Sequence, residues 1–304
     1  MDSPSDILEV RRVGVVGAGT IGKGVSQALA QTGHKVVLLD ITRQALERAR
    51  VGIAEAVRLH VLFSKTDAGE SPDAVLGRIT FETDYQLLSS VDFVIENVTE
   101  DWEIKKGVYA QLDAICPERC ILAANTSAIP IARIAALTTR APLILGMHFM
   151  NPVPLKRAVE VIRAEHTSEE TVRTAQILLA QMGKEGIVVH DSPGFVSNRV
   201  LMLAINEAMR VVQEQVASAR DVDRLFRMCF AHKMGPLETA DLIGLDTVLY
   251  TLQVLHESYG GQKYKPCALL EEMVRDGLHG RKSGQGFYTY PGQPSIGSTK
   301  EDRS

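Results

Sequence analysis

The stretch Val13-Gly14-Val15-Val16-Gly17-Ala18-Gly19-Thr20-Ile21-Gly22 decides the fold of this chain. Its apolar beginning is typical of a buried parallel strand, and a helical pattern follows the turn from Gly17 to Gly22. A second predicted strand, Lys35 to Leu39, ends next to Asp40. A glycine-rich turn between strand and helix, with an acid after the next strand, is the fingerprint of a dinucleotide-binding fold.

Each glycine of the turn has its own predicted task. Gly17 permits the tight turn, Gly19 leaves space for a pyrophosphate, and Gly22 lets the helix pack closely against the strand. The N–H groups at the start of the helix, where Thr20 and Ile21 lie, favour the phosphate charge. We therefore predict that these five residues contact the cofactor.

Asp40 selects among the possible cofactors. Its carboxylate is placed to accept hydrogen bonds from the adenosine ribose hydroxyls, and it would repel a 2′-phosphate. The sequence therefore predicts NAD in preference to NADP. Arg43 leaves an alternative open, because an arginine just past the acid could hold a phosphate or could simply face solvent.

Length, composition and net charge limit the classes of protein to which the chain can belong. Its 304 residues suffice for two domains, and 45% apolar with 23% charged residues is typical of a soluble globular protein. A net charge of −4 gives no electrostatic support for a nucleic acid or membrane partner. We expect no secretory signal and no membrane span. We expect reduced thiols rather than a metal site at Cys116 and Cys120, which fits the cytoplasm.

Strand and helix patterns alternate over residues 1–190. This alternation predicts an α/β domain with a doubly wound, mainly parallel Rossmann-type sheet. The predicted strands are 13–16, 36–39, 91–96, 121–124, 143–147, 159–162 and 186–189, and the predicted helices are 21–31, 42–63, 104–115 and 168–182. Residues 191–304 contain helical patterns only, so we predict an all-helical second domain, with a disordered tail from about residue 292.

Polar side chains follow several predicted strands at the edge of the sheet where ligands bind. Glu100, Ser127 and His148 lie at or just past such strand ends, and Glu160 lies on an apolar strand where a carboxylate needs a partner. We interpret His148 and Glu160 as an acid–base pair. His148 would take a hydroxyl proton during hydride transfer, and Glu160 would fix the imidazole tautomer. A core histidine and a solvent-facing glutamate remain the alternative.

The chain resembles the 3-hydroxyacyl-CoA dehydrogenase family over nearly its full length. The resemblance rests on a series of blocks in order: G-A-G-T-I-G at 17–22, E-N-V-T-E at 96–100, N-T-S at 125–127, H-F-M-N-P-V-P at 148–154, V-E-V-I at 159–162, D-S-P-G-F-V-S-N-R at 191–199, M-G-P-L-E at 234–238, G-L-D at 244–246 and G-R-K-S-G-Q-G-F-Y at 280–288.

The resemblance implies roles for individual residues. His148 and Glu160 match the family's catalytic pair, and Ser127 and Asn198 match its substrate-binding residues. The cofactor contacts match Glu100, Lys105 and Asn125. The resemblance also implies a homodimer paired through the helical domain and a hydroxyacyl thioester as substrate.

The acyl carrier stays open at this point. The basic residues after the second strand are few, notably Arg58 and Lys65, which is a thin patch for the 3′-phosphate of coenzyme A. Two stretches, 96–106 and 198–207, are similar to a polyketide-pathway branch whose members oxidise a glyceryl group on an acyl carrier protein. A sugar-acid dehydrogenase and a catalytically silent NAD-binding protein are further alternatives.

Overall fold

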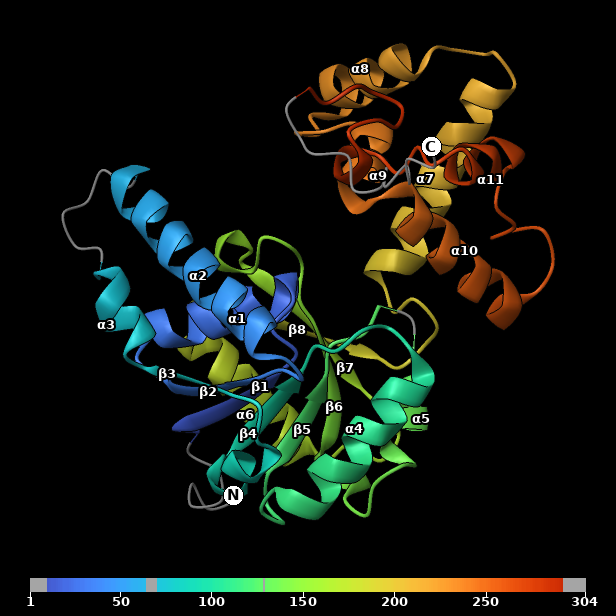
Figure 1. The fold of residues 1–304 in the computed structure, drawn as a ribbon. Coiled ribbons are helices and arrows are strands. Elements are labelled where there is room, and N and C mark those ends of the chain that lie inside the picture. The colour runs from blue at the N-terminus through green and yellow to red at the C-terminus, as the bar shows by residue number, and fades with distance from the viewer. Residues whose placement is uncertain (1–9, 64–69, 128, 292–304) are drawn as a thin grey trace, which may run out of the picture. The chain divides into compact units, whose positions relative to one another are not determined.

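The computed structural model describes residues 10–63, 70–127 and 129–291 (Figure 1). The chain divides into two compact units between Ser192 and Pro193. Lys65 and the tail from residue 292 lie outside the described residues. Within the described ranges, no helix is long and apolar enough to cross a lipid bilayer.

The first unit is built around one eight-stranded sheet in the order β3-β2-β1-β4-β5-β6-β7-β8 (Figure 1). Its strands are β1 (Arg12–Val16), β2 (Lys35–Leu39), β3 (Ile79–Glu82), β4 (Phe93–Glu96), β5 (Ile121–Ala124), β6 (Ile144–His148), β7 (Ala158–Arg163) and β8 (Glu185–His190). Its helices are α1 (Thr20–Gln31), α2 (Arg43–Phe63), α3 (Pro72–Leu76), α4 (Trp102–Ile115), α5 (Ile131–Ala135) and α6 (Glu169–Gln181), with short 3₁₀ turns η1 (Tyr85–Ser90), η2 (Ala141–Leu143) and η3 (Val153–Leu155).

Successive side chains of each strand point to opposite faces of the sheet, and each face packs against its own layer of helices and turns. Alternate strand residues such as Val13, Val15 and Phe93 pack in one core with Leu29 of α1 and Ile53 of α2. The intervening strand positions face the other layer. There Gly14 approaches the Leu88 side chain of η1, and Gly146 approaches Ile131 of α5. Helices thus cover both faces, and the predicted doubly wound Rossmann-type sheet is confirmed.

The strand β7 pairs antiparallel with β6, while the other strand pairs are parallel. The chain between His148 and Ala158 holds only the short turn η3, which is too little for a parallel crossover. The reversal aligns His148 of β6 directly opposite Glu160 of β7. Because paired residues project to the same face, the two side chains are held together by the ladder.

The second unit is helical, as predicted, with α7 (Ser197–Gln213), α8 (Ala219–Phe230), α9 (Pro236–Ile243), α10 (Leu245–Tyr259), α11 (Ala268–Arg275) and the turn η4 (Arg281–Ser283). Buried Asp223 of α8 accepts hydrogen bonds from the Leu237 and Glu238 N–H groups, both at 2.9 Å, and so caps α9. Buried Asp241 accepts bonds from the backbone N–H groups of Phe287 and Tyr288, both at 3.0 Å. These two aspartates tie the last residues of the described chain to the helices.

Candidate active site

The glycine turn is tight at Gly17, open at Gly19 and closely packed at Gly22. Gly17 has a φ of +95°, and a Cβ there would lie 2.6 Å from the Asn97 carbonyl oxygen. A Cβ on Gly19 would meet nothing within 4 Å, so this side of the turn is open. A Cβ on Gly22 would lie 1.8 Å from the Gly17 carbonyl oxygen. Gly22 therefore lets the helix pack against the turn itself rather than against the strand.

Asp40 joins the glycine turn to the second strand. Its Oδ2 accepts a hydrogen bond from the Ala18 N–H at 2.8 Å. It lines a cavity of about 520 Å³ together with the start of α1 and the first turns of α2. The lining residues are Ala18, Gly19, Thr20, Lys23, Asp40, Ile41, Thr42, Ala45, Arg48 and Ala49. An open turn, a helix start and a carboxylate after the second strand fit NAD.

Arg43 is paired with an acidic side chain other than Asp40. Its guanidinium group forms an ion pair at 3.0 Å with Glu82, at the end of β3. That strand was not predicted, because its four residues mix apolar and polar side chains and give only a weak strand pattern. Arg43 thus faces solvent, as one of the two interpretations expected, and it also forms an ion pair.

His148 stands between Glu160 and Ser127. Its Nδ1 lies 2.9 Å from Glu160 Oε2, and its Nε2 lies 3.1 Å from the Ser127 hydroxyl oxygen. Only 6% of the His148 side chain and 12% of the Glu160 side chain are exposed. A carboxylate on Nδ1 favours the tautomer that carries hydrogen there, which makes Nε2 the proton-accepting nitrogen of the ring. The arrangement can therefore act as a general base and, once protonated, as a general acid.

Glu100 and Asn125 hold the backbone around Ser127. Glu100 Oε1 accepts hydrogen bonds from the Thr126 hydroxyl and from the Ser127 N–H, the latter at 3.1 Å. Asn125 Oδ1 accepts a bond from the Phe149 N–H at 3.1 Å, so it connects the ends of β5 and β6. These predicted cofactor residues therefore border the His148 site within the same unit.

The structure adds Glu96, which the sequence analysis did not single out as a site residue. This last residue of β4 is fully buried, and both its carboxylate oxygens lie 2.9 Å from Lys105 Nζ. Burial raises the pKa of Glu96, and the adjacent Lys105 ammonium group opposes that rise. A carboxylate at the end of an apolar strand was the available signal, much as a carboxylate within an apolar strand was for Glu160.

The Lys105 ammonium group is surrounded by groups of the protein itself. Its side chain is fully buried, and its Nζ also lies 3.3 Å from the Asn125 carbonyl oxygen and 3.7 Å from Glu100 Oε2. It thus connects Glu96 to the residues that hold Ser127. Its contact with the cofactor stays a prediction, and its observed partners make it a positioning residue.

Asn198 and the cysteines are the remaining residues that the sequence analysis considered. Asn198 is a buried residue in the first turn of α7, in the second unit, and its substrate contact stays a prediction. Cys116, Cys120 and Cys267 are buried free thiols, and Cys229 is an exposed one. Among the described residues, no group of three or more His, Cys, Asp or Glu side chains could hold a metal ion.

Two family models match the chain in succession. The model described as "3-hydroxyacyl-CoA dehydrogenase, NAD binding domain" matches residues 12–192. The model described as "3-hydroxyacyl-CoA dehydrogenase, C-terminal domain" matches residues 194–290. Together they span both structural units.

Individual relatives give the same picture. A probable 3-hydroxybutyryl-CoA dehydrogenase of Deinococcus radiodurans is 45% identical over 280 residues, which covers 92% of this chain and 100% of the relative. A probable 3-hydroxybutyryl-CoA dehydrogenase of Bacillus subtilis is 42% identical, covering 93% and 98%. The crystal structure of (S)-3-hydroxybutyryl-CoA dehydrogenase PaaH1 from Ralstonia eutropha superposes with a TM-score of 0.88 at 42% identity, covering 93% and 99%.

Proposed function

Since the chain belongs to the 3-hydroxyacyl-CoA dehydrogenase family and is an NAD-dependent oxidoreductase, we propose how its residues divide the work. The reaction converts the CH–OH group of a 3-hydroxyacyl-CoA thioester into a ketone, and it can run in reverse. The observation that carries the assignment is the triplet Ser127–His148–Glu160, in which buried His148 has contacts of 3.1 Å and 2.9 Å to half-buried Ser127 and Glu160.

His148 moves the proton. Its Nε2 takes the hydroxyl proton of the substrate as the C–H bond at the same carbon breaks. NAD, when bound at the glycine turn, supplies the hydride acceptor. Glu160 stabilises the resulting imidazolium ion, since its carboxylate lies on Nδ1. In the reverse direction the imidazolium returns the proton to the oxygen of the reduced product.

Ser127 and Asn198 orient the substrate. The Ser127 hydroxyl already lies 3.1 Å from His148 Nε2, so a substrate oxygen bound beside it would be within reach of the same nitrogen. Asn198 is assigned by the matching family block D-S-P-G-F-V-S-N-R and supplies an amide group for the acyl chain or its carbonyl. Glu100 and Lys105 keep the Ser127 backbone in place.

The acyl carrier in this proposal is coenzyme A, and the acyl chain is short. Two relatives that match nearly the whole chain are named for 3-hydroxybutyryl-CoA. The relatives reported above are named for coenzyme A thioesters, and none of them is named for an acyl carrier protein or a polyketide role. We further propose a homodimer paired through the helical unit, which carries exposed apolar side chains on α8, and a reducing compartment such as the cytoplasm, which suits four free thiols.

The decisive assay follows NADH formation with 3-hydroxybutyryl-CoA, with a glyceryl-loaded acyl carrier protein measured in parallel. We expect rapid turnover of the CoA thioester with NAD and much slower turnover with NADP, because Asp40 would meet a 2′-phosphate with like charge. Faster turnover of the loaded carrier protein would move the proposal to that substrate. No thioester-dependent NADH formation would reject it.

A further inference from the structure

Lys184 is a buried lysine of the first unit that binds backbone carbonyls instead of an acid. Only 7% of the residue is exposed, and no carboxylate among the described residues forms an ion pair with it. Its Nζ donates hydrogen bonds to the carbonyl oxygens of Val153 and Lys156, both at 2.7 Å. Burial lowers the pKa of Lys184. Because burying an ammonium group without an anion is costly, a lysine at this position indicates a specific task.

The backbone of Lys184 is fixed at the end of α6. Gly183 has a φ of +68°, and the Lys184 N–H donates a hydrogen bond to the Leu179 carbonyl oxygen at 2.8 Å, the pattern of a Schellman motif. The next residue, Glu185, begins β8 and donates its N–H to the Arg157 carbonyl oxygen at 2.7 Å. Regular structure on both sides therefore gives the lysine side chain a defined starting point.

The two carbonyl groups belong to the loop that joins the strands of the proposed acid–base pair. Residues 149–157 connect His148, the last residue of β6, to β7, which carries Glu160. Val153 begins the turn η3 and Lys156 follows its end, so the ammonium group bridges the turn. Because this loop is the direct chain connection between the two strands, its position bears on the geometry of the pair.

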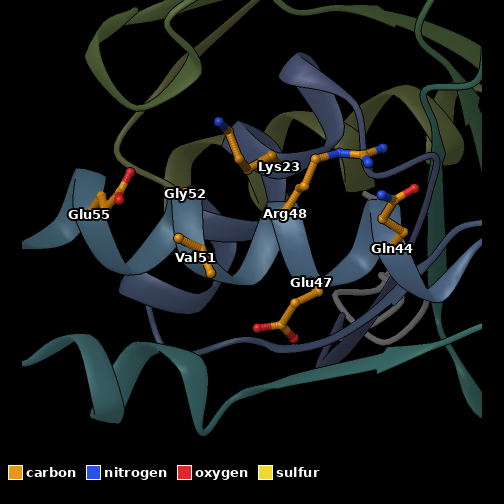
Figure 2. Close-up of a pocket in the computed structure, with 7 residues that line it drawn as sticks. All are labelled: Lys23, Gln44, Glu47, Arg48, Val51, Gly52 and Glu55. Carbon is orange, nitrogen blue, oxygen red and sulfur yellow. The ribbon is translucent and has the colours of Figure 1, made fainter.

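The same loop packs against α1, the helix that begins at the glycine turn. A Cβ on Gly24 of α1 would lie 3.0 Å from the Val153 Cβ, so the buried valine fills the space that the glycine leaves. Helix α1 is also held from the direction of α2, where Lys23 lies against Gly52 in the groove that Figure 2 shows. The turn η3 thus lies between α1 and the lysine at the end of α6.

We propose that Lys184 is a positioning residue for the dehydrogenase reaction. Its ammonium group holds η3 against α1, and the loop keeps His148 in a fixed position relative to the glycine turn. The proposal rests on the proposed function, because that function makes His148 the proton acceptor. A lysine suits the task, since its three donors sit on a long chain that reaches two carbonyl groups from outside the loop. A misplacement of about 1 Å can lower a rate about 100-fold, so such a hold bears directly on turnover.

Hydrogen–deuterium exchange tests the hold on the loop without turnover. Lys184→Met keeps the length of the side chain and removes its donors. Lys156→Met is the matched control, because it changes an exposed side chain of the loop itself and leaves the carbonyl group in place. The amides of Leu155 and Lys156, which are bonded within the turn, should exchange at least about tenfold faster in Lys184→Met and at the wild-type rate in the control. Wild-type exchange in Lys184→Met would overturn the proposal.

Steady-state kinetics test whether the hold serves catalysis. We expect Lys184→Met to lower kcat for 3-hydroxybutyryl-CoA at least about tenfold, while KM and the dissociation constant for NAD stay within about threefold. The control Lys156→Met should keep the wild-type kcat. In a His148→Ala background, Lys184→Met should cause no further loss, because no imidazole is left to position. A loss as large in that background as in the wild type would mean a general structural role and would overturn the proposal.

Lys184→Gln takes the place of Lys184→Met if the methionine variant does not fold. Its amide is one bond shorter than the lysine side chain and cannot bridge both carbonyl groups, so the same changes in exchange and kcat are expected. Wild-type values of both would refute the role of the lysine. A His148→Ala variant with wild-type kcat would reject the proposed function itself, whereas a slow His148→Ala beside a fully active Lys184→Met would reject the positioning role alone.

Discussion

His148 is the residue on which the proposed proton transfer depends. We expect His148→Ala to lower kcat by about two to four orders of magnitude, the range for a lost general acid–base group. The dissociation constant for NAD should change little, because the side chain contacts Ser127 and Glu160 rather than the glycine turn. Steady-state kinetics and NADH fluorescence titration measure the two quantities. A kcat within tenfold of the wild type would remove His148 from this role.

Glu160 is expected to act only through His148. Glu160→Gln keeps a hydrogen-bonding group beside Nδ1 but removes the anion that stabilises the imidazolium, so kcat should fall at least about tenfold. The double variant with His148→Ala should be no slower than His148→Ala alone, because the glutamate has nothing left to orient. If the loss of kcat in the double variant equals the product of the losses in the two single variants, the carboxylate has a role independent of His148.

Substitution of Glu96 tests the contribution of the buried ion pair that it forms with Lys105. Glu96→Gln leaves the Lys105 ammonium group buried without its anion, which should lower the free energy of unfolding by about 3–5 kcal/mol. Replacing both partners, as Glu96→Leu with Lys105→Met, should recover much of that loss. Denaturant unfolding measures both. If the double variant also binds NAD normally, Lys105 has no direct part in cofactor binding.

These residues differ in how far the sequence could predict them. His148 and Glu160 were paired because a buried carboxylate needs a partner and a histidine ended the neighbouring strand. The same reasoning applies to Glu96, the carboxylate at the end of the apolar strand β4. Its partner Lys105 lies on a helix, where the pattern of charges alone does not tell an inward lysine from a solvated one. Contacts across elements of different type are the least visible from sequence.

Among the individual elements, continuous apolar runs were predicted well and short segments of mixed character were missed. The strand at 121–124, which is apolar throughout, was predicted at its observed bounds. The strand β3 was not predicted because it mixes apolar and polar residues, and the helices α3 and α5 were not predicted because each has only five residues. The direction of β7 was not predicted either, because strand direction follows from the length of the connection rather than from the strand's own residues.

The end of α4 offers a pH-dependent test of how elements are joined. Asp113 accepts hydrogen bonds from the Thr139 N–H at 2.9 Å and from Arg140 Nε at 2.7 Å, which fix α4 to the segment before β6. Burial alone would raise the pKa of Asp113, but the bonds from Thr139 and Arg140 lower it below its ordinary value. The stability this carboxylate contributes is therefore present at neutral pH and lost as the pH falls through its folded-state pKa.

We accordingly expect Asp113→Asn to lower the free energy of unfolding by about 1–3 kcal/mol at pH 7. The difference from the wild type should shrink below about pH 4, where the unfolded-state aspartate becomes protonated. Urea unfolding at pH 7 and at pH 3 measures the change. An equal difference at both values would mean that the charge of Asp113 contributes nothing.

At the scale of the molecule, the sequence predicted two units of different architecture. The first was recognisable because one turn, one acid and alternating apolar runs all agree on a dinucleotide-binding sheet. The second was recognisable only as helical, since helical periodicity does not state how helices pack. Two buried acids, Asp223 and Asp241, each accept two backbone hydrogen bonds from residues 14 to 47 positions further along the chain, and such contacts leave no periodic pattern in the sequence.

The helical unit also carries the proposed dimer contact. On α8, Leu225, Met228 and Phe230 are 55%, 76% and 65% exposed, an apolar surface that a lone subunit leaves in water. If a second copy covers it, Met228→Glu should place a charge in that contact and weaken self-association by about thirtyfold or more. Sedimentation velocity across a concentration series measures this. Leu59→Glu on α2, also 53% exposed, is the matched control and should leave the dimer intact. A wild type that sediments as a monomer, or a Met228→Glu variant that remains as dimeric as the control, would reject α8 as the contact.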